Sequence, residues 1–271
     1  MDRPPADVQT CMSGQIRVER DGPIAHVVID YPKRRNALNL SMWAGIEQAM
    51  TGFSDDENVR AVIIRGEGTH FAAGADMSEF ATQWETEAKA HTAADQLARA
   101  TAAIEACPKP VIAAIEGSCM GAGLSIVTAA DIRVVASGAK FALPPAKIGA
   151  SYPYLDLRRL VDLVGQGPAR DLMLSARIMD VGEAERVGLV SRSVEDGHAL
   201  AVATQIADDI AALSPWALSA AKTMLNTIAS GASVEPQAMR DLQVSGFAGA
   251  EFKEGYTAFL EKRKPDFSGS D

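Results

Sequence analysis

The stretch VIAAIEGSCMGAGLSIVTAADIRVVA, residues 111–136, decides the fold of this chain. Its first five residues form a continuous apolar run, which is typical of a strand buried on both faces of a sheet. A loop of small residues follows, and after it we expect a helix over 124–130 and a further strand over 131–136. This order of strand, loop, helix and strand predicts an α/β protein with a largely parallel sheet.

The same order of elements occurs once before in the chain. Residues 61–64, AVII, predict another buried strand. The loop FAAGADM, residues 71–77, follows it and leads into a helical piece that starts at Met77. A long helix is then expected over 84–107, because the prolines at 108 and 110 would end it.

The two ends of the chain differ from this middle part. Residues 15–19 and 24–30 alternate as two strands do, and 40–50 has the apolar spacing of a helix. The residues after 195 look wholly helical, over 197–228 and 235–264. We therefore expect three regions: a disordered N-terminus over 1–13, an α/β core over 14–195 and a helical oligomerisation region over 196–271.

The two small-residue loops indicate a binding site for an electron-rich atom. Each loop follows a buried strand and opens a helix, where the first backbone N–H groups lack partners within the helix. Small side chains at Gly74, Gly121 and Gly123 would let a ligand approach that backbone closely. Two such helix starts facing one point would form an oxyanion hole. The alternative is a tight packing contact between helix and strand, and neither loop fits a P-loop or a GxGxxG pattern.

Composition excludes several classes of protein. The 271 residues carry a formal net charge of −9 and a pI of about 5.0, which disfavours nucleic acid or an anionic membrane as the main partner. Three cysteines without a CxxC pair argue against a disulfide framework or a thiolate metal site. No apolar run is long enough for a membrane span, and the start of the chain lacks the pattern of a signal peptide. We expect a cytoplasmic protein with no metal.

Several motifs together resemble the crotonase superfamily, the enoyl-CoA hydratase/isomerase fold. These are HFAAGADMSEF at 70–80, the run that begins PKPVIAAIEG at 108, YPKRRNALN at 31–39, and two C-terminal landmarks at 174–194 and 253–267. The resemblance covers residues 14–267. It implies a spiral of ββα units with two nearly perpendicular sheets, a C-terminal helical part, and assembly into trimers or into hexamers built from two trimers.

The resemblance also implies which residues bind an acyl-coenzyme A. The thioester carbonyl would accept hydrogen bonds from the backbone N–H groups of Ala75 and Ala122, which form the oxyanion hole. Coenzyme A enters as part of the substrate, so no separate cofactor is implied. The remaining implied substrate-binding and CoA-binding residues are Lys33, Arg34, Arg35, Ala73, Gly74, Asp76, Met77, Gly121, Ser125, Pro145 and Lys262. For Asp76, hydrogen bonds that brace the loop are favoured over proton transfer.

The chain departs from the family where the hydratases place their two glutamates. Ser125 stands two residues after the GxG and Pro145 stands after the proline of FxxP, so neither position offers a carboxylate. Two-glutamate hydration, with one base and one acid, is therefore not expected. Tyr152 resembles a tyrosine that points at the acyl group in some decarboxylase-like members, and the alternative is a packed aromatic ring with its hydroxyl at the surface. Asp156 could supply a carboxylate, although pairing with Arg158 or Arg159, or a role as an N-cap, is the favoured interpretation.

Three functional hypotheses follow, of which the weakest is a structural or regulatory protein that binds no thioester. The first is an enzyme, a lyase or an isomerase, whose oxyanion hole stabilises a thioester enolate, with Tyr152 and Asp156 as tentative catalytic residues. The second is a catalytically inactive protein that keeps the fold and binds acyl-CoA, which the loss of both glutamates favours.

Overall fold

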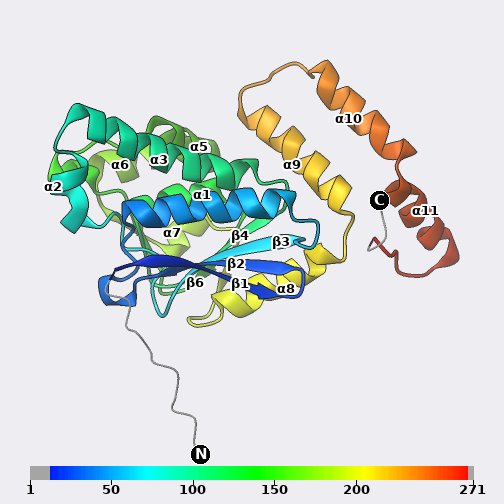
Figure 1. Cartoon of the computed structure of the whole chain (residues 1–271), viewed down its shortest axis with the longest axis horizontal. Helices are drawn as coiled ribbons and strands as arrows, with labels where there is room; N and C mark the ends of the chain where they lie inside the picture. Colours follow the sequence, from blue (N-terminus) through cyan, green and yellow to red (C-terminus); the bar gives the residue numbers. More distant parts are fainter. Residues whose placement is uncertain (1–12, 268–271) are drawn as a thin grey trace, which may run out of the picture.

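The computed structural model describes residues 13–267. Almost all of the expected disordered N-terminus, residues 1–12 with Cys11, lies outside the described residues, as do residues 268–271. In the described part, strands alternate with helices through the first two thirds of the chain, and helices follow alone (Figure 1). The α/β prediction is therefore confirmed.

A six-stranded sheet forms the base of the core. Its order is β1-β2-β3-β4-β6-β9, with β1 antiparallel to β2 and every other pair parallel. The strands are β1 Gln15–Asp21, β2 Ile24–Asp30, β3 Ala61–Gly66, β4 Val111–Ile115, β6 Ile132–Ala136 and β9 Arg192–Val194. Parallel strands end at the same edge of a sheet, so the loops after β3 and β4 lie beside each other.

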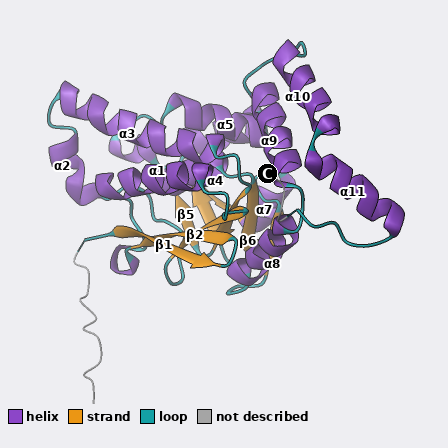
Figure 2. Cartoon of the chain, turned by 45° about the vertical axis from the view of Figure 1, so that its right-hand side comes forward, coloured by secondary structure: helices purple, strands orange, loops and turns teal. Residues whose placement is uncertain are grey.

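Apolar residues on both faces of this sheet are buried, as the continuous apolar runs predict. Along β3, Val62 and Ile64 pack into one hydrophobic cluster and Ile63 packs into another. Figure 2 shows most helices stacked above the strands and α8, Ala199–Ala211, below them. The helices of the upper layer are α1 Leu40–Asp55, α3 Glu87–Ala106, α4 Ala122–Ala129, α5 Tyr154–Val164 and α6 Gln166–Ser175.

The chain also forms a second, three-stranded sheet, and the sequence did not predict the first of its strands. It joins β5 Ser118–Met120 in parallel to β7 Lys140–Ala142, which pairs antiparallel with β8 Ile178–Asp180. A short helix, α7 Val181–Arg186, follows β8. The sequence predicted only a loop over 116–123, because its small residues have low strand propensity. Pairing with β7 overrides that propensity, since strand formation depends mainly on tertiary context.

Three helices form an arm that extends from the core. They are α9 Pro215–Ala229, α10 Gln237–Ala248 and α11 Ala250–Glu261, and Figures 1 and 2 show α10 and α11 standing off at one end. Lys222 of α9 anchors the arm, because its buried ammonium lies 2.7 Å from Asp131 at the start of β6. No helix among residues 13–267 is both long enough and apolar enough to cross a membrane.

Candidate active site

The two small-residue loops lie against each other. Ala72 and Cys119 form a parallel bridge, in which Ala72 donates its N–H to Ser118 O at 3.0 Å and accepts from Met120 N at 2.9 Å. Beyond the bridge the backbones stay close: a Cβ on Gly121 would lie 3.8 Å from the Cα of Gly74. Both glycines have a positive φ, +111° at Gly74 and +46° at Gly121, which other residues rarely adopt.

The start of α4 packs closely against the first loop at Gly123. A Cβ at this position would lie 3.0 Å from the carbonyl oxygen of Ala72 and 3.1 Å from its methyl group. A side chain at position 123 would therefore crowd the backbone of the first loop, and glycine avoids this. The packing role and the binding role that the sequence left as alternatives coexist here.

The two expected donors, Ala75 N–H and Ala122 N–H, flank this contact. Leu38 bridges to Ala75 by donating to Gly74 O at 2.8 Å and by accepting from Asp76 N at 2.8 Å. In this pattern the N–H of Ala75 takes no part in the bridge. Ala122 is the first residue of α4, where a backbone N–H has no acceptor within the helix. Both residues are half-buried.

Asp76 fixes the chain after the first loop. Its carboxylate accepts from Ser78 N at 3.0 Å and from Ser78 Oγ at 2.7 Å, and it caps the 3-10 helix η2, Met77–Glu79. This is the bracing role favoured from the sequence. The neighbouring Ala73 donates its N–H to Arg35 O at 2.9 Å, while the Met77 side chain is exposed.

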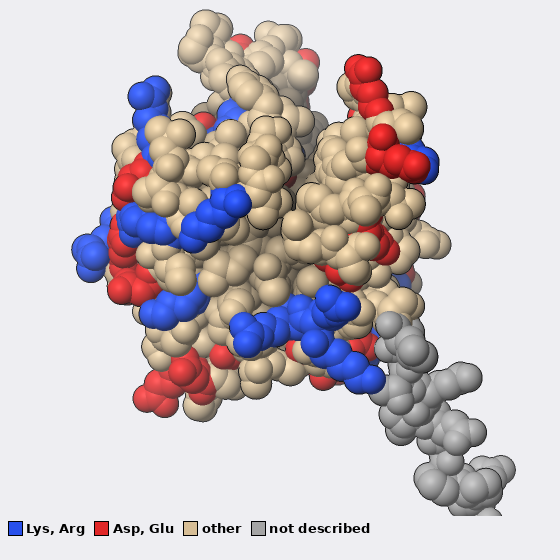
Figure 3. Space-filling model, turned by 90° about the vertical axis from the view of Figure 1, so that its left-hand side faces the viewer, with Lys and Arg blue, Asp and Glu red and all other residues tan. Residues whose placement is uncertain are grey.

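A basic turn borders the same loop. The 3-10 helix η1, Pro32–Arg34, and Arg35 expose three cations, and none of them forms an ion pair with another described residue. Figure 3 shows Lys and Arg side chains gathered on this side of the molecule. The hydrogen bond from Ala73 to Arg35 O joins this basic surface to the loop. A ligand with an anionic end and a carbonyl end could therefore span both.

Lys262 is not brought to this site within one chain. It lies at the C-terminal end of α11, at the opposite end of the molecule from η1 (Figure 1). Its side chain is exposed there.

Tyr152 is engaged with the second loop rather than pointing freely at a ligand. Its hydroxyl lies 2.8 Å from Ser125 Oγ and 3.0 Å from Gly121 O. Burial raises the pKa of this phenol well above its usual value. Neither sequence interpretation foresaw these bonds, because one placed the hydroxyl at the acyl group and the other at the surface.

Asp156 forms a buried ion pair with Arg159. Arg159 Nη1 lies 2.7 Å from Asp156 Oδ1, and Arg159 Nη2 lies 2.6 Å from Glu105 on α3. Burial raises the pKa of the Asp156 carboxyl above its usual value. The pairing with Arg159 that the sequence favoured is confirmed.

Other expected positions carry no chemistry of their own. Pro145 begins the 3-10 helix η3, Pro145–Ile148, on a partly exposed loop. Burial raises the pKa of the Cys119 thiol well above its usual value, which does not suit a nucleophile. Among residues 13–267, no group of His, Cys, Asp and Glu side chains could hold a metal ion.

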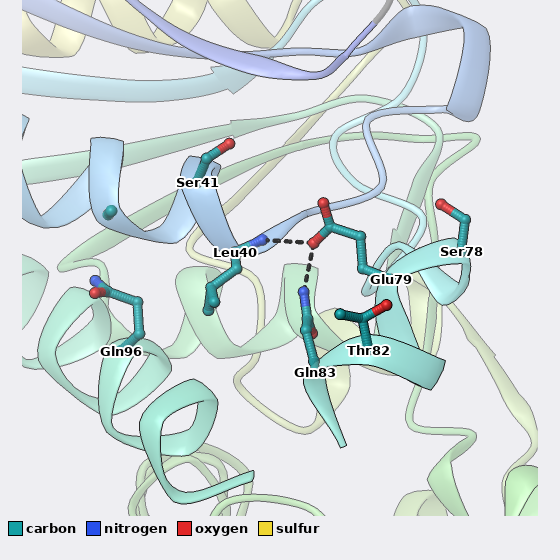
Figure 4. A pocket seen from close by; sticks show the side chains of 8 residues that line it. Leu40, Ser41, Ser78, Glu79, Thr82, Gln83 and Gln96 are labelled. Carbon is teal, nitrogen blue, oxygen red and sulfur yellow. Dashed lines mark hydrogen bonds between the residues drawn. The ribbon is translucent and has the colours of Figure 1, made fainter. Parts of the chain in front are cut away.

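A separate hollow of about 660 Å³ lies beside the first loop, between α1, α3 and the segment after the loop. Figure 4 shows Glu79 at its wall, accepting from Leu40 N at 3.1 Å and from the Gln83 amide. Besides these three, its lining residues are Ser41, Ala44, Ser78, Thr82 and Gln96. Neither Ala75 nor Ala122 lines it, so this hollow is distinct from the paired loops.

Two residues that support the loops were missed from the sequence. Asn36 is fully buried; it accepts from Tyr31 N at 2.9 Å and donates to Glu67 O and His70 O. His70 Nδ1 accepts from Ser118 N at 3.1 Å. Asn36 has a positive φ of +59°, which Asn tolerates better than most residues, so an Asn directly after the basic turn was the available sequence signal.

Comparison with known proteins identifies the family. Residues 19–270 match the enoyl-CoA hydratase/isomerase family. The chain belongs to this family. The expected crotonase resemblance and its α/β fold are thereby confirmed.

Individual members of the family agree along almost the whole chain. A crystal structure of an enoyl-CoA hydratase/isomerase family protein from Hyphomonas neptunium is 44% identical, superposes with a TM-score of 0.90, and the match covers 93% of this chain and 97% of that one. A Mycobacterium tuberculosis protein named "Probable enoyl-CoA hydratase" is 36% identical, over 93% of this chain and 97% of its own length. A crotonyl-CoA hydratase of Syntrophomonas wolfei is 34% identical, over 93% and 97%.

Proposed function

We propose that this protein is an enzyme that binds an acyl-CoA thioester at the paired loops and stabilises its enolate. The observation that supports the proposal is the close approach of Gly74 and Gly121, the residues directly before Ala75 and the helix-start Ala122. The names of its relatives, several of them enoyl-CoA hydratases, support a thioester substrate. The unpaired basic turn supports a nucleotide end with phosphates, which bind such cations well.

The chemistry follows from the two donors. A thioester carbonyl that accepts both N–H groups becomes more electron-poor, and a proton on the adjacent carbon becomes easier to remove. The negative charge then moves onto the carbonyl oxygen, where two preorganised donors stabilise it. Isomerisation, decarboxylation and hydration by a different base all pass through such an enolate.

The two-glutamate route to hydration is not part of the proposal. Ser125 and Pro145 occupy those positions, and neither can act as a carboxylate base or acid. Asp156 is the carboxylate that the sequence offered instead, and its raised pKa suits a base better than an ordinary aspartate does. Its ion pair with Arg159 opposes that use, because the pair holds the charge in place.

The direct test removes one donor, and it also places a ring carbon in front of the nitrogen, where the thioester oxygen would lie. Ala122 is the first residue of α4, where proline is tolerated because the N–H is not needed by the helix. Ala122→Pro should lower turnover by at least about 10²-fold, because loss of one oxyanion donor alone costs about 10²- to 10³-fold and the proline ring also blocks the oxygen's place. Turnover is first established in the wild type with a panel of enoyl-CoA and malonyl-CoA-type thioesters. The matched control, Ala250→Pro at the first position of α11, should leave turnover unchanged.

A second candidate function is binding of acyl-CoA without catalysis. It is favoured because both tentative catalytic side chains are already bonded to other protein groups. Tyr152 is held by Ser125 and Gly121, and Asp156 by Arg159, so neither is free to move a proton. A catalytically inactive acyl-CoA-binding protein would still be stabilised against heat by butyryl-CoA. It would turn over no thioester of the panel. If the wild type turns over a thioester and both Asp156→Asn and Tyr152→Phe keep that activity, a residue other than these two transfers the proton.

A further inference from the structure

The carbonyl of Gly121 and the N–H of Ala122 belong to the same peptide group. The N–H end of that group is the donor of the proposed oxyanion hole, and the inference below rests on that proposed function. The carbonyl end points into the protein, where it accepts from Tyr152 Oη at 3.0 Å and from Leu124 N at 2.8 Å. Tyr152 therefore bonds the carbonyl end of the peptide group whose N–H end faces the proposed oxyanion hole.

The protons of this contact can be assigned by counting. A carbonyl oxygen only accepts, so the single phenol proton of Tyr152 goes to Gly121 O. The hydroxyl of Ser125 lies 2.8 Å from the phenol oxygen and also hydrogen-bonds the Asp156 carboxyl, so its proton is shared between these two acceptors. The result is a chain of hydrogen bonds that links Ser125 and Tyr152 to the peptide, with the phenol donating to Gly121 O.

We propose that Tyr152 is a positioning residue that strengthens the Ala122 N–H as a donor to the substrate oxygen by hydrogen bonding to the carbonyl of the same peptide. A peptide group whose oxygen accepts a hydrogen bond becomes more polar, and its N–H becomes a better donor. Bonds in such a chain reinforce one another by about 10–30% each. The bond also fixes the peptide plane, since rotation would separate Gly121 O from the phenol.

The surroundings of Tyr152 keep its proton available for this role. The raised pKa, caused mainly by burial and next by the charge of Asp156, keeps the phenol neutral. Arg159 and Glu105 hold Asp156 and the α5 helix that follows Tyr152. A neutral phenol at a fixed place is what a donor to a carbonyl requires.

The test measures the polarisation of a bound thioester directly. Butyryl-CoA labelled with ¹³C at the thioester carbonyl is bound to the intact protein, and its carbonyl stretch is recorded by isotope-edited infrared difference spectroscopy. In the wild type the stretch should fall relative to free butyryl-CoA. In Tyr152→Phe this shift should shrink by about 10–30%. Turnover of an active thioester should fall roughly two- to eightfold at nearly constant KM. Loss of a whole donor costs about 10²- to 10³-fold, and about 10–30% of that activation free energy corresponds to this smaller fall.

Two further variants separate this role from a structural one. Tyr154→Phe is the matched control, because Tyr154 is a neighbouring tyrosine that is 79% exposed. It should leave both readouts unchanged. Tyr152→3-fluorotyrosine carries a more acidic phenol, which donates more strongly, so the carbonyl shift should increase. A side chain that merely fills space would not give opposite signs in the two Tyr152 variants.

The outcomes distinguish the role of Tyr152 from the proposed oxyanion hole on which it rests. No carbonyl shift in the wild type would overturn the oxyanion hole and this inference with it. A wild-type shift that stays the same in Tyr152→Phe and in Tyr152→3-fluorotyrosine would overturn only the role of Tyr152. Opposite changes in the two variants would support it.

Discussion

At the residue scale, the polar side chains behind the loops are held by buried charges. Arg159 is almost fully buried and neutralises Asp156, which is equally buried. The sequence allowed this pair to be anticipated, because the two residues lie three apart on one helix. It could not reveal Glu105, because that contact joins α5 to a helix more than 50 residues away.

The Arg159 pair gives the first prediction. Arg159→Met should lower the free energy of unfolding by about 3–5 kcal/mol, since it leaves the Asp156 carboxylate buried without its partner. Arg158→Met is the matched control: its pair with Asp162 is partly exposed and 3.6 Å long, so its loss should cost less than about 1 kcal/mol. Urea unfolding of both variants measures the difference. Equal losses would contradict the assigned role of Arg159.

The second residue-scale prediction concerns pH. Burial, and next the charge of Arg65, lower the pKa of His26 below its usual value. The unfolded chain therefore takes up a proton near pH 6.5 while the folded chain does not. Stability from this group is present above pH 6.5 and is lost as the pH falls, by at most about 1.4 kcal/mol per pH unit.

Unfolding free energies at pH 7.5 and 5.5 check this. Replacement His26→Gln should make the fall with decreasing pH smaller, whereas His91→Gln, at an exposed position on α3, should leave it unchanged. An unchanged fall in His26→Gln would show that other groups cause it.

At the element scale, strand and helix order could be predicted from apolar patterning, and the second sheet could not. The buried strands β3 and β4 and the helices α1 and α3 lie where their apolar residues predict them. Strands β5, β7 and β8 have only three residues each, which is too short for any periodicity to appear. They exist because β7 offers backbone partners on both sides, and no local sequence reports that.

The glycines of the two loops give an element-scale prediction. Gly123→Ala should lower the free energy of unfolding by about 1–3 kcal/mol, because the new methyl group would press on the backbone of Ala72 at 3.0 Å. It should also weaken butyryl-CoA binding, since it separates the loops. In Gly167→Ala, on helix α6, the new methyl group would meet nothing within 4 Å, and stability should rise by about 0.5–1 kcal/mol. A loss in Gly167→Ala equal to that in Gly123→Ala would contradict the close-approach account.

At the scale of the whole molecule, the arm formed by α9, α10 and α11 exposes many large apolar side chains. Its exposed side chains include Leu225, Ile228, Val234, Val244, Phe247, Tyr256, Phe259 and Leu260. Contiguous exposed apolar surface commonly marks an interaction site. We propose that the arm packs against other copies in a trimer or a hexamer, as the family resemblance implies, which would also bring Lys262 toward another subunit.

Light scattering tests this assembly. The wild type should have three or six times the chain mass of 28.6 kDa. The double variant Phe247→Asp and Phe259→Asp should reduce that mass, because it places charges on the arm surface. Val18→Asp adds a charge to an exposed position on β1, away from the arm, and should not change the mass. A monomeric wild type would remove the proposed role of the arm.

The central claim is that the two loops present Ala75 N–H and Ala122 N–H to one oxygen. A crystal structure of the protein with bound butyryl-CoA measures this most directly. The account predicts a thioester oxygen within about 2.7–3.2 Å of both nitrogens, with the nucleotide end near Lys33, Arg34 and Arg35. A thioester oxygen bound to one amide only, or held elsewhere on the protein, would contradict it.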